Sequence, residues 1–502
     1  MNRAHRLARL LRILAAIVAE PGLNPLELAE RAGVSDRTLR RDLAQLRDLG
    51  YEVEYTSGYE VQEKLNLDGR SKKGRSGKST GEKQELELLQ AVAQAVAQVR
   101  LGDRGGPHAA PASRPRPTSK ARPATAAPLV LIAGGDADTD FYYATGFGVE
   151  AGLYIRFGDG DDLLAVSPLE IDRAREEGRV KSVLGYQEVG YEELGRWVSW
   201  PRVAARLLAS KGHSAARVGP ALRGGHLDEL RAAGLAVEVD RDLFVAERRH
   251  KSDHEAKAIA AAQEAAEAAV TWVVRELARA EIKDGLLWLE GRPLTSEQLY
   301  AGASLLLGEL GFTCPEMIIA GSPESAMPHF RGAGQLRANV PVIIDIFPSS
   351  RTSHYHGDLT RTVVVGEVPE QIRRMHAAVL QSLDAGIESI RGGIPARDVH
   401  HTVCEVLVDR GYGTTTTGYE GADGGPKMNH STGHGVGLDV HEAPNLRGPG
   451  DDVLQDGDVV TVEPGLYELG LGGVRIEDTG RVTASGFENF TRISRSLDPR
   501  DY

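Results

Sequence analysis

The sequence predicts an α/β protein of several domains, and three observations support this prediction. The chain has 502 residues, which is too long for one hydrophobic core and corresponds to about three domains of ordinary size. Its composition, 41% apolar and 26% charged residues, is that of a soluble globular protein. From Pro128 onward, strand patterns alternate with helix patterns, whereas residues 1–127 contain helix patterns and stretches rich in Gly, Pro and Ser. We therefore expect a small helical head before a larger α/β body.

The head has the element order of a winged helix-turn-helix. Three helical patterns open the chain at 3–20, 24–33 and 35–50. The alternating segment 51–61 then predicts a short β-hairpin. We expect residues 1–65 to form this domain.

The third helical pattern carries a candidate DNA-contacting surface. Leu39, Leu43 and Leu46 form its apolar stripe, and basic or hydroxyl residues in its first turns point elsewhere: Arg37, Thr38, Arg40 and Arg41. Such residues at the start of a recognition helix suit contact with a DNA major groove. The stretch GVSDRTLRRDL also resembles the recognition helix of DeoR-type bacterial regulators. The alternative is a solvated charged face, because three nearby aspartates dilute the positive charge.

Residues 66–127 have the composition of a flexible linker. The stretches 69–84 and 102–127 are rich in Gly, Ser, Pro, Ala and basic residues and cannot bury a core. Between them, residues 82–100 predict a helix that either pairs with a second copy of the chain or forms an isolated spacer. Pairing would fit a homodimer, which is the assembly we expect.

Charge differs sharply between head and body. Residues 1–127 hold 22 Lys+Arg against 15 Asp+Glu, a formal charge of +7, whereas the remaining residues carry −19. A basic head on an acidic body favours different partners for the two parts, with DNA expected for the head. There is no run of eighteen apolar residues, so we expect no membrane span. The two cysteines, Cys314 and Cys404, fit neither a disulfide framework nor a metal site, so we expect a cytoplasmic protein.

The body divides into two predicted domains, residues 128–245 and 246–502. Strands are expected at PLVLIAGG, GLYIRFG and DLLAVS, and helices at SWPRVAARLLASKG and, over 250–278, at the start of the second domain. In the second domain, an apolar strand delivers Asp345 and a second strand begins with Asp358. Two carboxylates on a hairpin can converge on a hard cation, although such aspartates often cap turns.

Further acidic residues and a histidine extend this pair. In VVTVEPGLYE and GGVRIEDTG, strand alternation places Glu463 and Glu477 opposite buried-type Val and Ile. An acidic group in such surroundings costs free energy unless it is paired or bound to a metal. In STGHGVGLDVHE, glycines surround His434. Four carboxylates and one imidazole are a ligand set for two adjacent divalent cations, and its oxygen-rich character favours Mn²⁺, with Co²⁺, Zn²⁺ and Fe²⁺ as alternatives.

The order and local contexts of these residues resemble one metallopeptidase superfamily. The contexts are DIFP, GDLTRT, GHGVGL, EPGLY and RIED, and the superfamily is that of methionine aminopeptidase, aminopeptidase P, prolidase and creatinase. The resemblance covers about residues 245–496 and implies a pita-bread α/β fold. TDFYYATGF and ERRHKSDHEAKAIAAA resemble the creatinase-type N-terminal domain and the start of the catalytic domain. This extra domain points to an Xaa-Pro peptidase, whose substrate is a peptide with proline at the second position.

The resemblance also implies a role for each residue. Asp345 would chelate one metal, Asp358 and Glu477 would bridge both, and His434 and Glu463 would complete the second. Glu463 would in addition shuttle a proton from the attacking water. The residues that match substrate-contacting or intermediate-stabilising groups are His329, His430, His441 and Arg475.

Some features depart from the family or lie outside its pattern. Phe347 stands where most relatives have glycine, and Asp345 and Asp358 are further apart than usual. Creatinase itself lacks the metal set, which argues against a creatine amidinohydrolase. The other histidines are expected to be exposed in the hairpin loop or on helix surfaces: His354, His356, His376, His400 and His401.

A different class of function remains open. The protein would then be a transcription regulator whose peptidase-like body senses a peptide or a metal while the head binds an operator. In a third interpretation the head has no function, because the linkers make the two halves mechanically independent.

Overall fold

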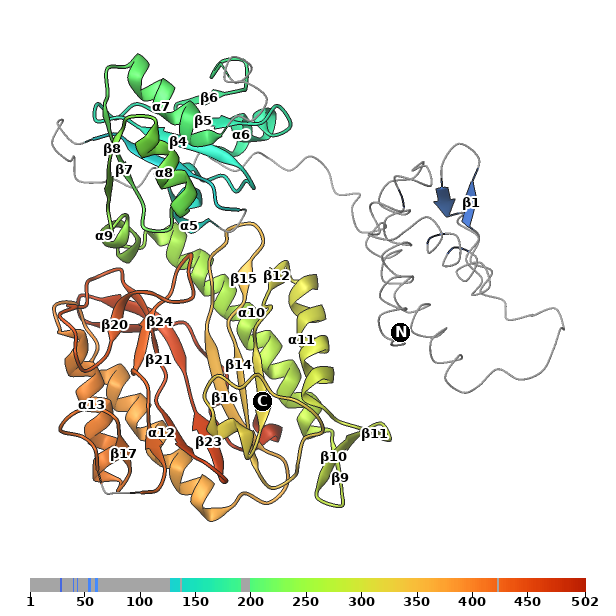
Figure 1. The fold of residues 1–502 in the computed structure, drawn as a ribbon. Helices are drawn as coiled ribbons and strands as arrows, with labels where there is room; N and C mark the ends of the chain where they lie inside the picture. Colours follow the sequence, from blue (N-terminus) through green and yellow to red (C-terminus); the bar gives the residue numbers. More distant parts are fainter. Residues whose placement is uncertain are drawn as a thin grey trace. The chain divides into compact units, whose positions relative to one another are not determined.

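The computed structural model divides the chain into two units, Met1–Ala112 and Ser113–Tyr502 (Figure 1). In the second unit it describes residues 127–502 except 136–137, 191–198 and 422–423. In the first it describes two strands and three leucines: Val53–Tyr55, Tyr59–Val61, Leu28, Leu39 and Leu43.

The described part of the first unit agrees with the predicted head. Leu28, Leu39 and Leu43 are helical and buried. Strand β1 (Val53–Tyr55) pairs antiparallel with β2 (Tyr59–Val61), with Val53 opposite Val61, which confirms the predicted hairpin. The predicted helix at 82–100 lies outside the described residues. The same holds for the candidate DNA-contacting residues of the head: Arg37, Thr38, Arg40 and Arg41.

The second unit begins with a six-stranded sheet in the order β6-β5-β4-β3-β7-β8. Its strands are β3 (Leu129–Ile132), β4 (Gly152–Arg156), β5 (Asp162–Val166), β6 (Ser182–Leu184), β7 (Ala215–Val218) and β8 (Ala236–Val239). The helices of this region are α5 (Thr139–Thr145), α6 (Ile171–Glu177), α7 (Trp200–Ser210), α8 (Gly224–Ala232) and α9 (Val245–Arg249). The apolar side of α7, including Val203 and Leu208, belongs to the same buried cluster as Val130 and Ile155 of the sheet. The predicted strands and helix of this region are confirmed.

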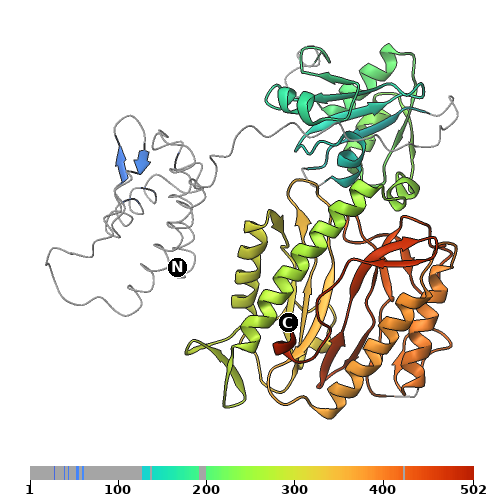
Figure 2. The same cartoon turned by 180° about the vertical axis from the view of Figure 1, so that it is seen from behind.

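Four helices cover the sheets of the C-terminal part: α10 (Asp253–Ala278), α11 (Ser296–Glu309), α12 (Glu370–Ser389) and α13 (Ala396–Asp409). The N-terminus of α10 is fixed by a reciprocal capping box between Ser252 and Glu255. Figure 2 shows the long yellow-green α10 crossing in front of the central strands, with α12 and α13 side by side on the other half. One buried core lies under α10 and α11, and a second lies under α12 and α13.

The strands of this part form several sheets. The three-stranded sheet β13-β14-β16, the four-stranded β17-β18-β22-β23 and the five-stranded β20-β19-β21-β24-β25 make up its centre, and two small sheets, β11-β10-β9 and β12-β15, lie outside it. The bounds are β9 (Glu281–Lys283), β10 (Leu286–Leu289), β11 (Arg292–Pro293), β12 (Phe312–Thr313), β13 (Ile318–Gly321), β14 (Pro341–Ile346), β15 (Ser349–Ser350), β16 (Leu359–Val364), β17 (Gly413–Thr414), β18 (Lys427–Met428), β19 (Gly433–Gly435), β20 (Glu442–Leu446), β21 (Val459–Val462), β22 (Gly465–Glu468), β23 (Gly472–Arg475), β24 (Asp478–Thr483) and β25 (Gly486–Asn489). Short 3₁₀ turns lie at η2 (Glu324–Ala326) and η3 (Pro499–Asp501). No helix in the described part of the chain is long and apolar enough to cross a membrane.

The predicted hairpin that carries two aspartates is present. Strands β14 and β16 pair antiparallel, with Asp345 opposite Thr360, and Asp358 directly precedes β16. Glu463 directly follows β21, and Glu477 lies between β23 and β24. The acidic residues thus stand at strand ends and on neighbouring strands in the middle of this part.

The prediction for the remaining histidines was wrong. His400 is only 2% exposed, because α13 packs it between the hydroxyls of Thr432 and Thr416. The other four are half-buried rather than exposed: His354, His356, His376 and His401. Of these, His376 has its Nε2 2.9 Å from the Arg495 carbonyl oxygen. His441 directly precedes β20 and lies in a loop.

Candidate active site

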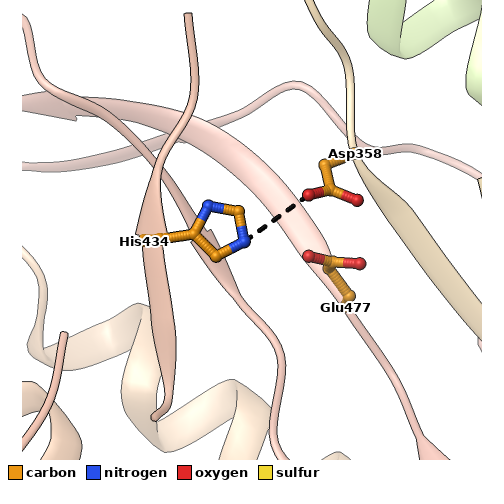
Figure 3. Close-up of side chains that lie close together, drawn as sticks. All are labelled: Asp358, His434 and Glu477. Atoms are coloured by element: carbon orange, nitrogen blue, oxygen red, sulfur yellow. Dashed lines mark ion pairs between the residues drawn. The ribbon is translucent and has the colours of Figure 1, made fainter. Parts of the chain in front are cut away.

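Three residues far apart in the sequence, one on a strand and two directly beside strand ends, bring possible ligand atoms together (Figure 3). Asp358, His434 and Glu477 are buried, and one ligand atom of each lies within 4.8 Å of the others. His434 Nε2 lies 3.6 Å from Asp358 Oδ2 and 3.4 Å from Glu463 Oε1. His434 Nδ1 lies 3.1 Å from the Gly435 carbonyl oxygen, which assigns the proton to Nδ1. The lone pair of Nε2 therefore faces the carboxylates.

The glycine before His434 has a steric reason. A Cβ atom at Gly433 would lie 2.1 Å from the carbonyl oxygen of Thr461 on the neighbouring strand β21. The His434 backbone N–H donates to the Thr461 hydroxyl at 3.1 Å. Only glycine permits this close approach, so β19 lies directly against β21, which leads to Glu463.

Asp345 joins the cluster through a buried arginine. Arg475 Nη2 donates to Asp345 Oδ2 at 2.5 Å, and Arg475 Nη1 donates to the hydroxyl of Tyr467 at 2.9 Å. Asp345 Oδ1 is buried and accepts no hydrogen bond from any described residue. Its lone pairs are therefore available to a cation.

The electrostatics of the cluster favour bound cations. Burial raises the pKa of Glu463 to about 8, although Arg475 opposes the shift. Burial, and then the carboxylates of Asp345 and Glu463, raise the pKa of Asp358 well above its ordinary value. Burial, and then Asp358, have the same effect on the pKa of Glu477. Repelling buried carboxylates, one free carboxylate oxygen and an oriented imidazole fit divalent metal ions.

A hydrogen-bonded chain leads away from this cluster. Arg475 donates to the Tyr467 hydroxyl, which lies 2.9 Å from His430 Nε2, and His430 Nδ1 lies 2.7 Å from the Ser431 carbonyl oxygen. Burial lowers the pKa of His430 to about 3, so the ring is neutral and the tyrosine hydroxyl donates to it. Tyr467 was not among the site residues predicted from the sequence. The alternation of β22 would have indicated it, because Leu466 points into the core and Tyr467 therefore points to the other face.

The other two candidate histidines are exposed near the cluster. The rings of His441 and His434 lie 4.3 Å apart, edge to face. Burial lowers the pKa values of His430 and His441, and His329, shortly after η2, is close enough to add a smaller contribution to both. The exposed positions of His329 and His441 suit contact with a substrate rather than a structural role.

Comparisons with known proteins agree with this geometry. The model of metallopeptidase family M24 matches residues 257–484, the creatinase/prolidase N-terminal domain matches 128–222, and an HTH domain matches 9–60. The chain is similar to a Xaa-Pro dipeptidase of Pyrococcus horikoshii, with 30% identity over 373 residues, 73% of this chain and 93% of the relative. A Xaa-Pro dipeptidase of Pyrococcus furiosus is 35% identical over 183 residues, 36% of this chain and 49% of that relative.

Solved structures show the same fold. The prolidase from Pyrococcus horikoshii OT3 has a TM-score of 0.61 and 27% identity, with 74% of this chain and 95% of that chain covered. The prolidase from Pyrococcus furiosus has a TM-score of 0.60 and 25% identity, with 73% of this chain and 97% of that chain covered. These similarities confirm the expected pita-bread fold with a creatinase-type N-terminal domain and a helix-turn-helix head.

Proposed function

Because the chain belongs to metallopeptidase family M24 and is a peptidase, we propose that it is a dinuclear Xaa-Pro peptidase of the prolidase or aminopeptidase P type. It hydrolyses the bond between an amino acid and a proline at the second position. The observation that carries this proposal is the buried convergence of Asp358, His434 and Glu477 beside Glu463. The Xaa-Pro dipeptidase relatives support the substrate class.

The five proposed ligands are divided between two ions. Asp345 would hold one ion, Asp358 and Glu477 would be shared between the two ions, and His434 and Glu463 would hold the second ion. A pair of divalent cations at such a site supplies Lewis acidity and lowers the pKa of a bound water towards neutrality. The oxygen-rich ligand set favours Mn²⁺, with Co²⁺, Zn²⁺ and Fe²⁺ as alternatives.

The protein's own groups handle protons and charge. Glu463, whose carboxylate lies beside His434, takes the proton of the attacking water and passes it to the leaving proline nitrogen. Arg475 is buried and permanently charged, and it holds the Tyr467 hydroxyl and Asp345 in place. His329 and His441 contact the substrate and stabilise the charge that develops on the carbonyl oxygen. His430 orients Tyr467.

A substrate profile tests the proposal. The purified full chain with Mn²⁺ is offered Xaa-Pro dipeptides and Xaa-Pro tripeptides, and amino acid release is measured. Glu463→Ala abolishes release, whereas Glu468→Ala, at the far end of β22, leaves it unchanged. His434→Ala lowers the metal content, and His441→Ala keeps the metal content but slows turnover. A wild type that binds two ions and cleaves no Xaa-Pro peptide would exclude this activity.

The domain layout is part of the proposal. Residues 1–65 form the winged helix-turn-helix, 66–127 the linker, 128–245 the creatinase-like domain and 246–502 the catalytic domain, and the protein is a homodimer. The HTH match at 9–60 favours DNA binding by the head through the candidate residues already named: Arg37, Thr38, Arg40 and Arg41. A gel shift with the full chain at low salt, compared with Arg40→Ala, tests this.

The second candidate function is a regulator that uses the peptidase-like body as a sensor, and the HTH match is the observation that favours it. In that case DNA affinity changes when a peptide or Mn²⁺ is added. If neither addition changes the affinity for DNA, DNA binding is not coupled to the body and the sensor function is excluded.

A further inference from the structure

The loop that carries His441 is closed on itself. It runs from Gly437 to Glu442 between β19 and β20, and the Gly437 N–H donates to the Asp439 carbonyl oxygen at 3.0 Å. A Cβ atom at Gly437 would lie 2.4 Å from Glu442 Oε1, so the carboxylate at the end of the loop folds against the backbone at its start. The loop therefore has one compact shape, with the exposed His441 ring beside His434.

Arg248 grips this loop on both sides of His441. Its Nη2 donates to Asp439 Oδ2 at 2.6 Å and to Glu442 Oε2 at 2.5 Å. Lys251, 2% exposed, donates to the other oxygen of Glu442 at 2.6 Å. Two residues that flank His441 closely are thus fixed by cations from the α9–α10 segment.

The N-terminal domain takes part in the same network. Arg248 Nη1 lies 3.3 Å from Asp140 Oδ1, and the Thr139 hydroxyl donates to Asp439 Oδ2 at 3.1 Å. Both residues begin α5, which belongs to the region that matches the creatinase/prolidase N-terminal domain. Leu438 of the loop is buried in one cluster with residues of α5. The loop therefore has polar and apolar anchors in the N-terminal domain.

The charges make Arg248 essential to this arrangement. Three carboxylates, those of Asp140, Asp439 and Glu442, face two cations, Arg248 and Lys251. The Arg248 side chain is only 12% exposed. Burial raises the pKa of Asp140 to about 6, and Arg248 opposes this shift. Without the guanidinium, three partly buried carboxylates would repel one another and the loop would open.

We propose that Arg248 is a positioning residue for His441, and that through Arg248 and Asp140 the N-terminal domain becomes a structural part of the active site. This inference rests on the proposed role of His441 at the substrate. Arg248 lies between the two family matches, on the segment that joins the domains. Its guanidinium sets the position of the loop, and the loop sets the position of the imidazole.

A double-mutant cycle tests the kinetic part on the full chain with Mn²⁺. Arg248→Met is expected to lower kcat for an Xaa-Pro dipeptide roughly tenfold, since small displacements of catalytic groups have large effects on rate. Its metal content stays that of the wild type. Arg248→Lys restores part of the loss. In the His441→Ala background, Arg248→Met costs less than about twofold, because the group through which it acts is gone.

Arg249→Met is the matched control. Arg249 neighbours Arg248, is equally charged and is buried against Asp458 and the Val453 carbonyl oxygen, and these hydrogen bonds go to residues outside the His441 loop. It is expected to lose stability and to keep kcat within about twofold. If the two methionine variants lose kcat equally, or if the Arg248 effect is undiminished without His441, the positioning role is wrong.

Hydrogen–deuterium exchange tests the anchoring without any activity. Peptides that cover residues 437–442 are expected to exchange faster in Arg248→Met and in Asp140→Asn than in wild type or Arg249→Met. Unchanged exchange in Arg248→Met would overturn the inference. A wild type that cleaves no Xaa-Pro peptide removes the proposed function, while the exchange measurement still decides whether Arg248 and the N-terminal domain fix this loop.

Discussion

Replacement of Gln263 by leucine is expected to destabilise the protein and weaken its metal binding. Gln263 lies on α10 and is fully buried among alanines and valines. Its Oε1 accepts from the Asp358 N–H at 2.8 Å, and its Nε2 donates to the Asp358 carbonyl oxygen at 2.9 Å. Nε2 also donates to the Thr491 hydroxyl at 2.9 Å. One side chain therefore fixes both backbone groups of a candidate bridging ligand.

The magnitude follows from the partners that remain. The Asp358 carbonyl oxygen keeps the hydroxyl of Thr479 at 2.7 Å, and the Thr491 hydroxyl, which accepts from Gln263, still accepts from the Thr479 N–H at 3.0 Å. The Asp358 N–H is left buried without its acceptor, which costs about 1–3 kcal/mol.

Chemical denaturation of the metal-free full chain measures this loss, and calorimetric titration with Mn²⁺ measures binding. Gln335→Leu is the control, because its Nε2 also donates to a backbone carbonyl, that of Leu287, on a sheet that carries no candidate ligand. It should cost about 1 kcal/mol and leave Mn²⁺ affinity unchanged. If Gln263→Leu stays within about 0.5 kcal/mol of wild type and binds Mn²⁺ equally well, the claim that this amide orders Asp358 is refuted.

Three further predictions concern buried charge. Glu477→Gln should raise the unfolding midpoint of the metal-free protein, since it removes one repelling carboxylate, yet lower Mn²⁺ affinity in calorimetry; a lower midpoint would contradict this. For His400, burial lowers the pKa to about 4, so between pH 7.5 and 5 the unfolded chain takes up a proton that the folded protein refuses, and stability falls by about 2 kcal/mol. His400→Gln should lose about 2 kcal/mol less than wild type over that range in urea titrations, and equal losses would argue against this. Arg361→Met should lower the free energy of unfolding by about 3–5 kcal/mol in denaturation, because the guanidinium, 1% exposed, donates to Asp478 and to four backbone carbonyls. A loss below about 1 kcal/mol would contradict the view that these buried bonds stabilise the fold.

Local patterns were sufficient for the elements and for the positions of the acidic residues. A hairpin joins residues that are close in the chain, so β14, β16 and the places of Asp345 and Asp358 follow from apolar alternation and a polar turn. Alternation likewise separates Glu463 and Glu477 from their core-facing neighbours, and the core contains Val460, Val462, Val474 and Ile476 as expected. These signals have a range of a few residues, which is also the range of the interactions that produce them.

The burial and contacts of polar residues on helices could not be predicted from these local patterns, because their partners lie far along the chain. Gln263 bonds a residue 95 positions away, and Arg248 bonds residues 191 and 194 positions away. In the sequence both look like solvated positions of amphipathic helices. The predicted exposure of His400 was wrong for the same reason, since Thr432, its hydrogen-bond partner, belongs to the strand region that covers α13. A helical period identifies a face, and it does not say whether another element covers that face.

The charge balance of the centre gives an argument for two ions rather than one. Asp345, Asp358, Glu463 and Glu477 contribute four negative charges when ionised, and Arg475, which forms an ion pair with Asp345, contributes one positive charge. One divalent cation would leave the cluster at −1, and the carboxylates would still repel an oxyanion. Two would bring it to +1, a surplus that favours negative charge developing on a substrate carbonyl oxygen. We expect metal loading to relieve the repulsion that adds to burial in raising the pKa values of Asp358, Glu463 and Glu477, and to prepare the site for the reaction. The number of bound ions should then track activity in a titration, with the second ion giving the larger increase.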